Sequence, residues 1–167
     1  MQRKNYKKRK SFPDASGLAV GVVVADFNRG ITGRMLEGAL EVLKASEVKK
    51  TDIHVLHVPG SFEVPFGCLT LLKKKKYDAL VALGCIIKGE TEHDRYIAAA
   101  VSEGLMQLSL RYNVPIGFGI ITTNDLAQAE VRSRGEANKG KEAALAAVKL
   151  GILNQYVPES PRPLMGF

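Results

Sequence analysis

The chain has 167 residues, 46% of them hydrophobic and 25% charged, as expected for one soluble globular domain with its own core. No apolar run approaches the roughly 20 residues that span a bilayer, and no apolar segment follows the basic N-terminus. We therefore expect neither a membrane helix nor a secretory signal. Two cysteines, Cys68 and Cys85, provide no disulfide framework and no metal-ligand spacing, so a reducing cytoplasm is the expected compartment.

The net charge of +7 is concentrated at the N-terminus. Six positive charges precede the first acid, Asp14: Arg3, Lys4, Lys7, Lys8, Arg9 and Lys10. Subtracting these six from +7 leaves +1 for the rest, which carries no recognised nucleic-acid-binding motif. We predict a flexible basic arm at residues 1–14, with contact to RNA or to acidic surfaces as the alternatives.

Short apolar runs alternate with helical spacing along the chain. Strands are predicted at residues 18–25, 53–58, 79–83 and 116–121, and helices at 31–45, 63–72, 97–111, 126–133 and 141–150. This alternation predicts a single domain at 15–157, an α/β fold with three α/β/α layers and a mostly parallel four-stranded sheet. Pro158, Pro161 and Pro163 indicate an irregular Pro-rich tail at 158–167.

The segment from Gly84 to Tyr96 is the most distinctive stretch of the chain. It leads from a predicted buried strand, through a polar loop bounded by glycines, into a predicted helix. The loop combines the His93 imidazole and the Thr91 hydroxyl with backbone amides at a helix start, where anions are favoured. Ligands bind at the carboxyl ends of parallel strands, so this segment predicts a binding site.

Polar and aromatic residues follow all four predicted strands, at one edge of the predicted sheet: Phe27-Asn28, Gly60 to Glu63, Gly89 to His93, and Thr122-Thr123. The chain lacks a Walker sequence, and no Gly-x-Gly-x-x-Gly follows its first strand. His54 and His57 have no partners at ligand spacing, so no metal site is expected. The residues indicate a pocket for a polar, phosphorylated small molecule, with His93 as the acid–base candidate near neutral pH.

Five motifs support a more specific interpretation. In chain order they are Phe27-Asn28, Val58 to Glu63, Gly84 to His93, Phe118-Gly119 with Thr122-Thr123, and Asn138 to Gly140 with Glu142 to Ala144. Each is weak alone, but together, in this order and spacing, they closely resemble the 6,7-dimethyl-8-ribityllumazine synthases from Phe27 to about Leu150. The fold that this resemblance implies is flavodoxin-like.

The resemblance implies a transferase of riboflavin biosynthesis that uses no cofactor and no metal. In its penultimate-step reaction, 5-amino-6-(D-ribitylamino)uracil condenses with 3,4-dihydroxy-2-butanone 4-phosphate, releasing phosphate and water. A Schiff base forms, phosphate is eliminated, and ring closure gives the lumazine. Each step moves a proton, so one well-placed imidazole can serve several of them.

The resemblance also implies roles for individual residues. His93 matches the catalytic histidine, and the phosphate is expected at Gly89, Glu90, Thr91 and Arg132. The remaining substrate contacts are expected from Phe27, Asn28, Gly60, Ser61, Phe62, Glu63, Ile86, Ile87, Lys88, Phe118 and Lys139.

Two features depart from the family pattern. Most members have an aromatic residue and then an acid after the histidine, whereas this chain has Asp94 and Arg95, which leaves open which carboxylate orients His93. Glu90 and Glu92 place two acids beside the expected phosphate site, so both side chains are expected to turn outward.

The resemblance further implies a homopentamer with active sites at the subunit interfaces. A shell of 60 subunits is the larger alternative, and riboflavin synthase is a candidate partner. Two other functions are compatible with the sequence: a non-catalytic flavin- or lumazine-binding or shell-forming protein of the same fold, and RNA binding through the basic arm. The first needs neither His93 nor Arg132, so the presence of both favours the enzyme.

Overall fold

A computed structural model describes residues 12–157, so the predicted tail and most of the predicted arm lie outside the described part of the chain. Four strands form one parallel sheet in the order β2-β1-β3-β4. Their bounds are Val20–Ala25 for β1, Ile53–Val58 for β2, Ala79–Ile87 for β3 and Ile116–Thr123 for β4. The prediction of a four-stranded parallel sheet is confirmed.

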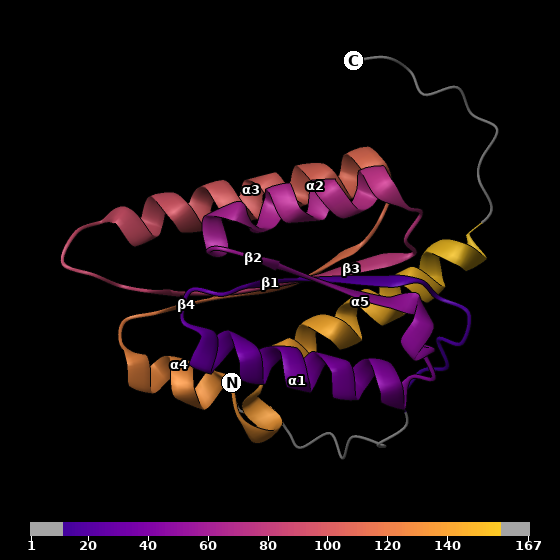
Figure 1. The fold of residues 1–167 in the computed structure, drawn as a ribbon, viewed down its shortest axis with the longest axis horizontal. Coiled ribbons are helices and arrows are strands. Elements are labelled where there is room, and N and C mark those ends of the chain that lie inside the picture. Colours follow the sequence, from indigo (N-terminus) through magenta and orange to yellow (C-terminus); the bar gives the residue numbers. More distant parts are fainter. Residues whose placement is uncertain (1–11, 158–167) are drawn as a thin grey trace, which may run out of the picture.

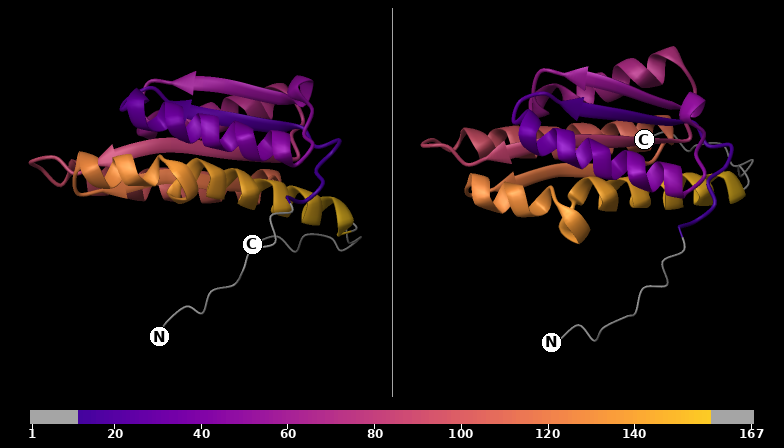
Figure 2. Two further views of the ribbon diagram at one scale, coloured as in Figure 1. Left: turned by 90° about the horizontal axis from the view of Figure 1, so that it is seen from below. Right: turned by 60° about the horizontal axis from the view of Figure 1, so that its bottom comes forward.

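Helices cover both faces of the sheet, as Figures 1 and 2 show. One layer contains α1 (Arg29–Ala45), α4 (Leu126–Arg132) and α5 (Lys139–Tyr156), and the other contains α2 (Val64–Lys74) and α3 (His93–Tyr112). Single turns of 3₁₀ helix lie at Lys50–Asp52 (η1), Ser61–Glu63 (η2) and Gly135–Ala137 (η3). The predicted three-layer α/β/α sandwich is confirmed.

The sheet has a hydrophobic core on each face. Along β1, Val20, Val22 and Val24 belong to the core under α1 and α5, and Val23 and Ala25 to the core under α2 and α3. Successive side chains of a strand point to opposite faces, so a strand covered on both sides must be apolar throughout. This explains the unbroken apolar run at the start of the domain.

Among the element boundaries that differ from the prediction, two shorten the central loop. Strand β3 continues to Ile87, because Gly84 to Ile87 pair in parallel with Ile120 to Thr123 of β4. Helix α3 starts at His93 rather than at residue 97. The polar loop is therefore reduced to residues 88–92.

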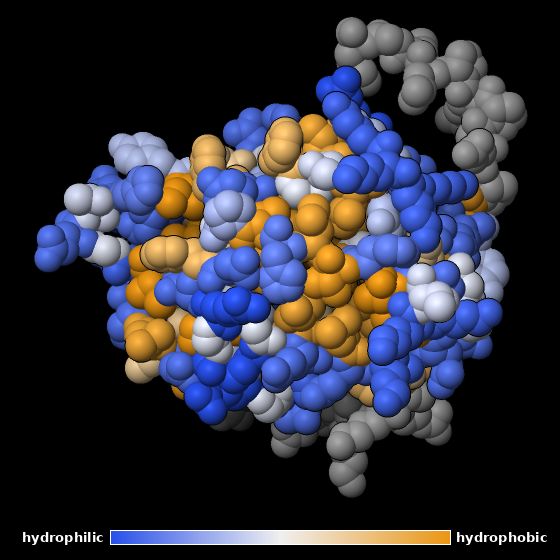
Figure 3. Space-filling model, in the orientation of Figure 1, coloured by the Kyte–Doolittle hydropathy of each residue, from blue (hydrophilic) through white to orange (hydrophobic). Residues whose placement is uncertain are grey.

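Figure 3 shows apolar surface across the middle of one face, flanked by hydrophilic residues. Large apolar side chains are also exposed on α2, α3 and β4, namely Phe66, Tyr96, Met106, Leu110 and Phe118. Patches of this kind mark contact surfaces for other molecules. None of the helices within residues 12–157 is long and apolar enough to cross a membrane.

Helices α1 and α5 approach each other at a glycine. A Cβ atom added to Gly140 would overlap the carbonyl oxygen of Met35 in α1. Gly140 is thus required by the backbone-to-backbone approach of the two helices.

We predict that Gly140→Ala destabilises the fold by about 1–3 kcal/mol, because backbone must shift to admit the methyl group. Gly33→Ala is the matched control in α1, since nothing lies within 4 Å of its added Cβ. The control should stabilise the fold by about 0.5–1 kcal/mol. Urea unfolding of the two variants measures both values. Equal stability of both variants would contradict this account of the helix pair.

Candidate functional site

A cavity of about 750 Å³ opens at the carboxyl ends of β1, β2 and β3. Strand β1 pairs with β2 on one side and with β3 on the other, so the chain connections diverge at this point of the sheet. Parallel α/β sheets bind ligands in the crevice outside such a switch point. A cavity therefore lies at the strand ends where the sequence predicts a binding site.

Most of the predicted site residues line this first cavity: Phe27, Asn28, Gly60, Ser61, Phe62, Glu63, Ile86, Ile87, Gly89, Thr91 and His93. The sequence prediction did not include five further lining residues, Cys85, Asp94, Tyr96, Ile97 and Ala100. Ile97 and Ala100 follow His93 at helical spacing, so they could have been predicted had the start of α3 been known.

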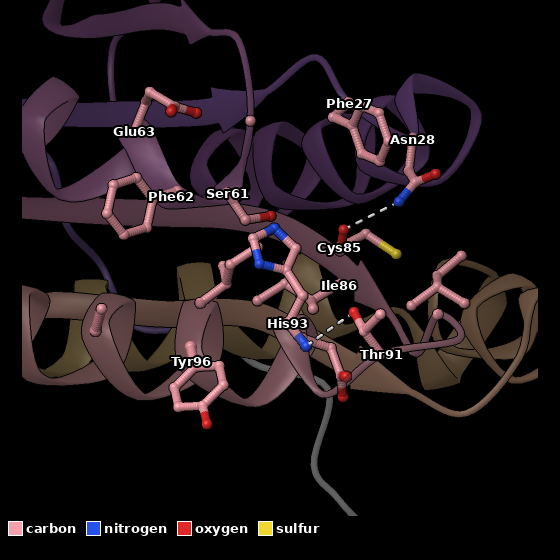
Figure 4. A pocket seen from close by; sticks show the side chains of 16 residues that line it. Phe27, Asn28, Ser61, Phe62, Glu63, Cys85, Ile86, Thr91, His93 and Tyr96 are labelled. Carbon is pink, nitrogen blue, oxygen red and sulfur yellow. Dashed lines mark hydrogen bonds between the residues drawn. The ribbon is translucent and has the colours of Figure 1, made fainter.

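His93 begins α3, and Figure 4 shows its ring directed into the cavity on the side of Ser61. The Thr91 hydroxyl accepts a hydrogen bond from the His93 backbone N–H at 3.4 Å, which helps to start the helix. The Ser61 hydroxyl is buried and has no hydrogen-bond partner among the described residues. A buried hydroxyl without a partner is costly unless a ligand or water completes it.

Gly84 makes room for that hydroxyl. A Cβ at this position would lie 2.6 Å from Ser61 Oγ and 3.0 Å from Ile120 Cδ1. The absence of a side chain in the middle of β3 thus lets η2 approach the sheet closely. Gly84 was predicted to bound a loop, but it lies within β3 and makes room for Ser61.

Asn28 braces the turn that carries Phe27. Its backbone is in the left-handed region at φ 62°, which Asn tolerates better than most residues. Its side-chain Nδ2 donates to the Cys85 carbonyl oxygen at 3.1 Å, the bond drawn in Figure 4. Phe27 N donates to the Pro59 carbonyl oxygen at 2.9 Å, so the turn is held from β2 and β3 together. The Phe27 ring, 70% exposed, lies at the rim of the cavity.

The two acids of the loop, Glu90 and Glu92, lie outside the cavity lining, whereas the first acid of α3 lies in it. Glu92 pairs with Arg95 at 3.0 Å, and Glu90 is exposed and does not line the cavity. Asp94 does line it, and its Oδ1 is buried without a partner among the described residues. Within residues 12–157 no carboxylate hydrogen-bonds the His93 ring, and the one hydrogen bond at this residue that fixes its position is made by its backbone N–H.

The cysteine in the cavity is not a nucleophile near neutral pH. Burial raises the pKa of the Cys85 thiol to about 11, so it stays protonated there. No group of three His, Cys, Asp or Glu side chains that could hold a metal ion occurs in the described part of the chain. His93 is the only imidazole in the cavity lining.

Three predicted site residues lie elsewhere. Phe118, Arg132 and Lys139 line a second cavity of about 450 Å³ on the outer edge strand β4, between α4 and α5. Lys88 and Glu90 line neither cavity. A single chain therefore does not bring His93 and Arg132 into one site.

Arg132 supplies the available positive charge of the second cavity. Its Nη1 donates to the Gln128 carbonyl oxygen at 3.0 Å, and no acid pairs with it among the described residues. Lys139, by contrast, pairs with Glu142 at 2.8 Å. The carboxylate of Glu130 is occupied by Arg134 and Arg34, whose hydrogen bonds, that of Arg134 above all, lower the pKa of Glu130.

Comparison with known proteins extends over nearly the whole domain. Residues 17–155 match the sequence model of the family described as 6,7-dimethyl-8-ribityllumazine synthase. A protein of that name from Parabacteroides distasonis is 44% identical over 141 residues, covering 84% of this chain and 88% of its own length. The protein of that name from Phocaeicola vulgatus is 43% identical, covering 84% of each chain.

Proposed function

The chain belongs to the 6,7-dimethyl-8-ribityllumazine synthase family, and from this premise we propose how its two cavities carry out the family's reaction. The chain is a transferase of riboflavin biosynthesis that condenses 5-amino-6-(D-ribitylamino)uracil with 3,4-dihydroxy-2-butanone 4-phosphate. The observation that carries the site assignment is the gathering of Phe27, Ser61 and His93 around the first cavity.

The pyrimidine binds in the first cavity, beneath Phe27. The exposed aromatic ring at the rim can stack on a flat heterocycle, and the apolar side chains of Ile86 and Ile87 border it. The unpaired Ser61 hydroxyl and the Glu63 carboxylate offer hydrogen bonds to polar groups of the ligand, including the ribityl chain. Asn28 contributes through its side-chain oxygen and the second hydrogen of Nδ2, because the first is donated to Cys85.

His93 moves protons between the reacting atoms. The amine of the pyrimidine loses a proton as it attacks the ketone, and the departing hydroxyl gains one when the Schiff base forms. An imidazole can accept a proton at one step and donate it at the next, so it can take both roles in turn. Its ring is directed into the cavity while the buried thiol of Cys85 stays protonated, which supports this assignment.

The phosphate group lies between the start of α3 and Arg132. Gly89 and Thr91 border the first cavity beside a helix N-terminus, where free N–H groups and the helix dipole favour an anion. Arg132 has no acidic partner within residues 12–157 and can grip a phosphate through two hydrogen bonds.

These two groups belong to one site only if neighbouring copies share it. Phe118, Arg132 and Lys139 line a cavity distinct from that of His93, so a second copy must bring its second cavity to the first. The exposed apolar side chains of α2, α3 and β4 provide surface for such a contact. A repeated head-to-tail contact closes into a ring, and we propose the homopentamer. The cytoplasm is its proposed compartment, since both cysteines are free and buried.

His93→Ala should lower kcat by roughly 10²-fold, the usual contribution of a positioned proton carrier. Activity should persist at that level, because the substrates are still held together. The fluorescence of the lumazine product follows the rate. His54→Ala is the matched control, since His54 lies on β2 and does not line the cavity. A His93→Ala rate no lower than that of the control would remove His93 from the mechanism.

Arg132→Ala should raise KM for the butanone phosphate by about tenfold or more, because two charge-assisted hydrogen bonds to the phosphate are lost. KM for the pyrimidine should change far less, and inorganic phosphate should cease to compete. Arg134→Ala is the control from the same region, since Arg134 pairs with Glu130 and lines neither cavity. Equal effects of Arg132→Ala on both substrates would contradict the phosphate assignment.

Mixed rings test whether the site is shared. His93→Ala and Arg132→Ala subunits, unfolded together and reassembled at equal amounts, should regain activity towards about a quarter of wild type. This fraction is expected because about one directed interface in four joins an intact His93 to an intact Arg132. Mass spectrometry confirms mixing. Rings that mix and yet show only the average of their parents place each site within one chain.

A further inference from the structure

The turn between α4 and α5 is fixed by one buried amide. Asn138 is only 4% exposed, and its Nδ2 donates to the carbonyl oxygens of Arg34 and Ser133, both at 2.9 Å. Its Oδ1 accepts from the backbone N–H groups of Gly140 at 2.8 Å and Lys141 at 3.3 Å. A carboxamide has two donor hydrogens and two acceptor lone pairs, so every one of these capacities is used.

These bonds join three helices. Arg34 belongs to α1, Ser133 caps the end of α4, and Gly140 and Lys141 belong to the first turn of α5. Arg34 strengthens the same junction through its side chain, because its Nε donates to Ser133 Oγ at 3.0 Å. Ser133 is itself 1% exposed, so this junction lies inside the protein.

Two of the residues that line the second cavity flank this turn. Arg132 is the last residue of α4, directly before Ser133, and Lys139 is the first residue of α5, directly after Asn138. Arg132 is the neighbour of Ser133, whose carbonyl oxygen Asn138 binds, and Lys139 is the neighbour of Asn138 itself. A shift of the turn would therefore move both cationic groups relative to β4.

We propose that Asn138 is a positioning residue that sets the affinity for the phosphate-bearing substrate by fixing Arg132 on the second cavity. The inference rests on the proposed function, because it takes the second cavity to be part of the phosphate site. Many residues cap a helix, but the two donor hydrogens of Asn138 are what tie the cap to α1 and to α4.

Two variants isolate these donors. Asn138→Asp keeps the shape and the acceptor of the cap but has no N–H, and it turns an oxygen towards two carbonyls. Asn138→Ser also keeps a cap acceptor and avoids that repulsion, but it is too short to reach the carbonyls. The matched control is Asn154→Asp, at the other end of α5, where an exposed Nδ2 donates to the Asn113 carbonyl oxygen at 3.0 Å.

We expect both Asn138 variants to raise KM for the butanone phosphate, and the inhibition constant of inorganic phosphate, by about tenfold. KM for the pyrimidine and kcat should stay within about twofold of wild type, as should all four constants of the control. The combination of Asn138→Ser with Arg132→Ala should be no worse than Arg132→Ala alone, because the amide acts through that arginine. A residue that served stability alone would lower Tm and leave the ratio of the two KM values unchanged.

The outcomes separate this inference from the proposed function. Should Arg132→Ala leave KM for the butanone phosphate unchanged, the phosphate assignment itself fails. If Arg132→Ala raises that constant but folded Asn138→Ser does not, only the positioning role is overturned. Independent, multiplying effects in the double variant would also overturn it. Asn138→Ser keeps the test decisive where Asn138→Asp does not fold.

Discussion

The parallel pairing of β1 with both β2 and β3 is the constraint on which the rest of the structure depends. Because β2 and β3 lie on opposite sides of β1, the connections that follow these strands diverge. This divergence leaves a crevice at the carboxyl ends of the strands. The crevice stays open because the turn after β1 is tied on both flanks, by Phe27 N to Pro59 and by Asn28 Nδ2 to Cys85. The lining of the first cavity comes from strand ends, from the turns and loops that follow them and from the first turns of α3.

The edge position of β4 has an equally direct effect on function. Strand β4 has a neighbouring strand on one side only. Residues along its open side therefore lie away from the crevice at β1. Phe118 and Arg132 consequently line a surface that another molecule must cover before it becomes an enclosed site. Under the proposal of a shared site, the order of the strands couples the reaction to the assembly of the protein.

Much of this organisation could be predicted from the sequence, because it follows from local patterns. The β-branched run of β1 requires burial on both faces, and Asp125 is a residue type that commonly caps helices and accepts from Gln128 N at 2.8 Å at the start of α4. The predicted end of β3 was wrong because Gly84 is a residue typical of loops. Only the pairing of Gly84 with Ile120 of β4 explains why the strand continues there. The distribution of the predicted site residues over two cavities could not be read from spacing, since it depends on where β4 lies in the sheet. Asn138 was noted only as part of a motif, because its four partners come from positions as distant in sequence as Arg34.

The burial of the two cysteines has a practical consequence for labelling chemistry. Cys68 and Cys85 are the only thiols in the chain, and burial raises their pKa to about 12 and about 11. Alkylating and maleimide reagents require an accessible thiolate, so neither native thiol competes for them while the protein is folded. A cysteine introduced on an exposed helix face can thus carry a fluorophore or spin label at one known position, with no need for a cysteine-free background. Reaction of the native thiols would in turn report the opening of the core on both faces of the sheet, since Cys85 and Cys68 belong to opposite ones.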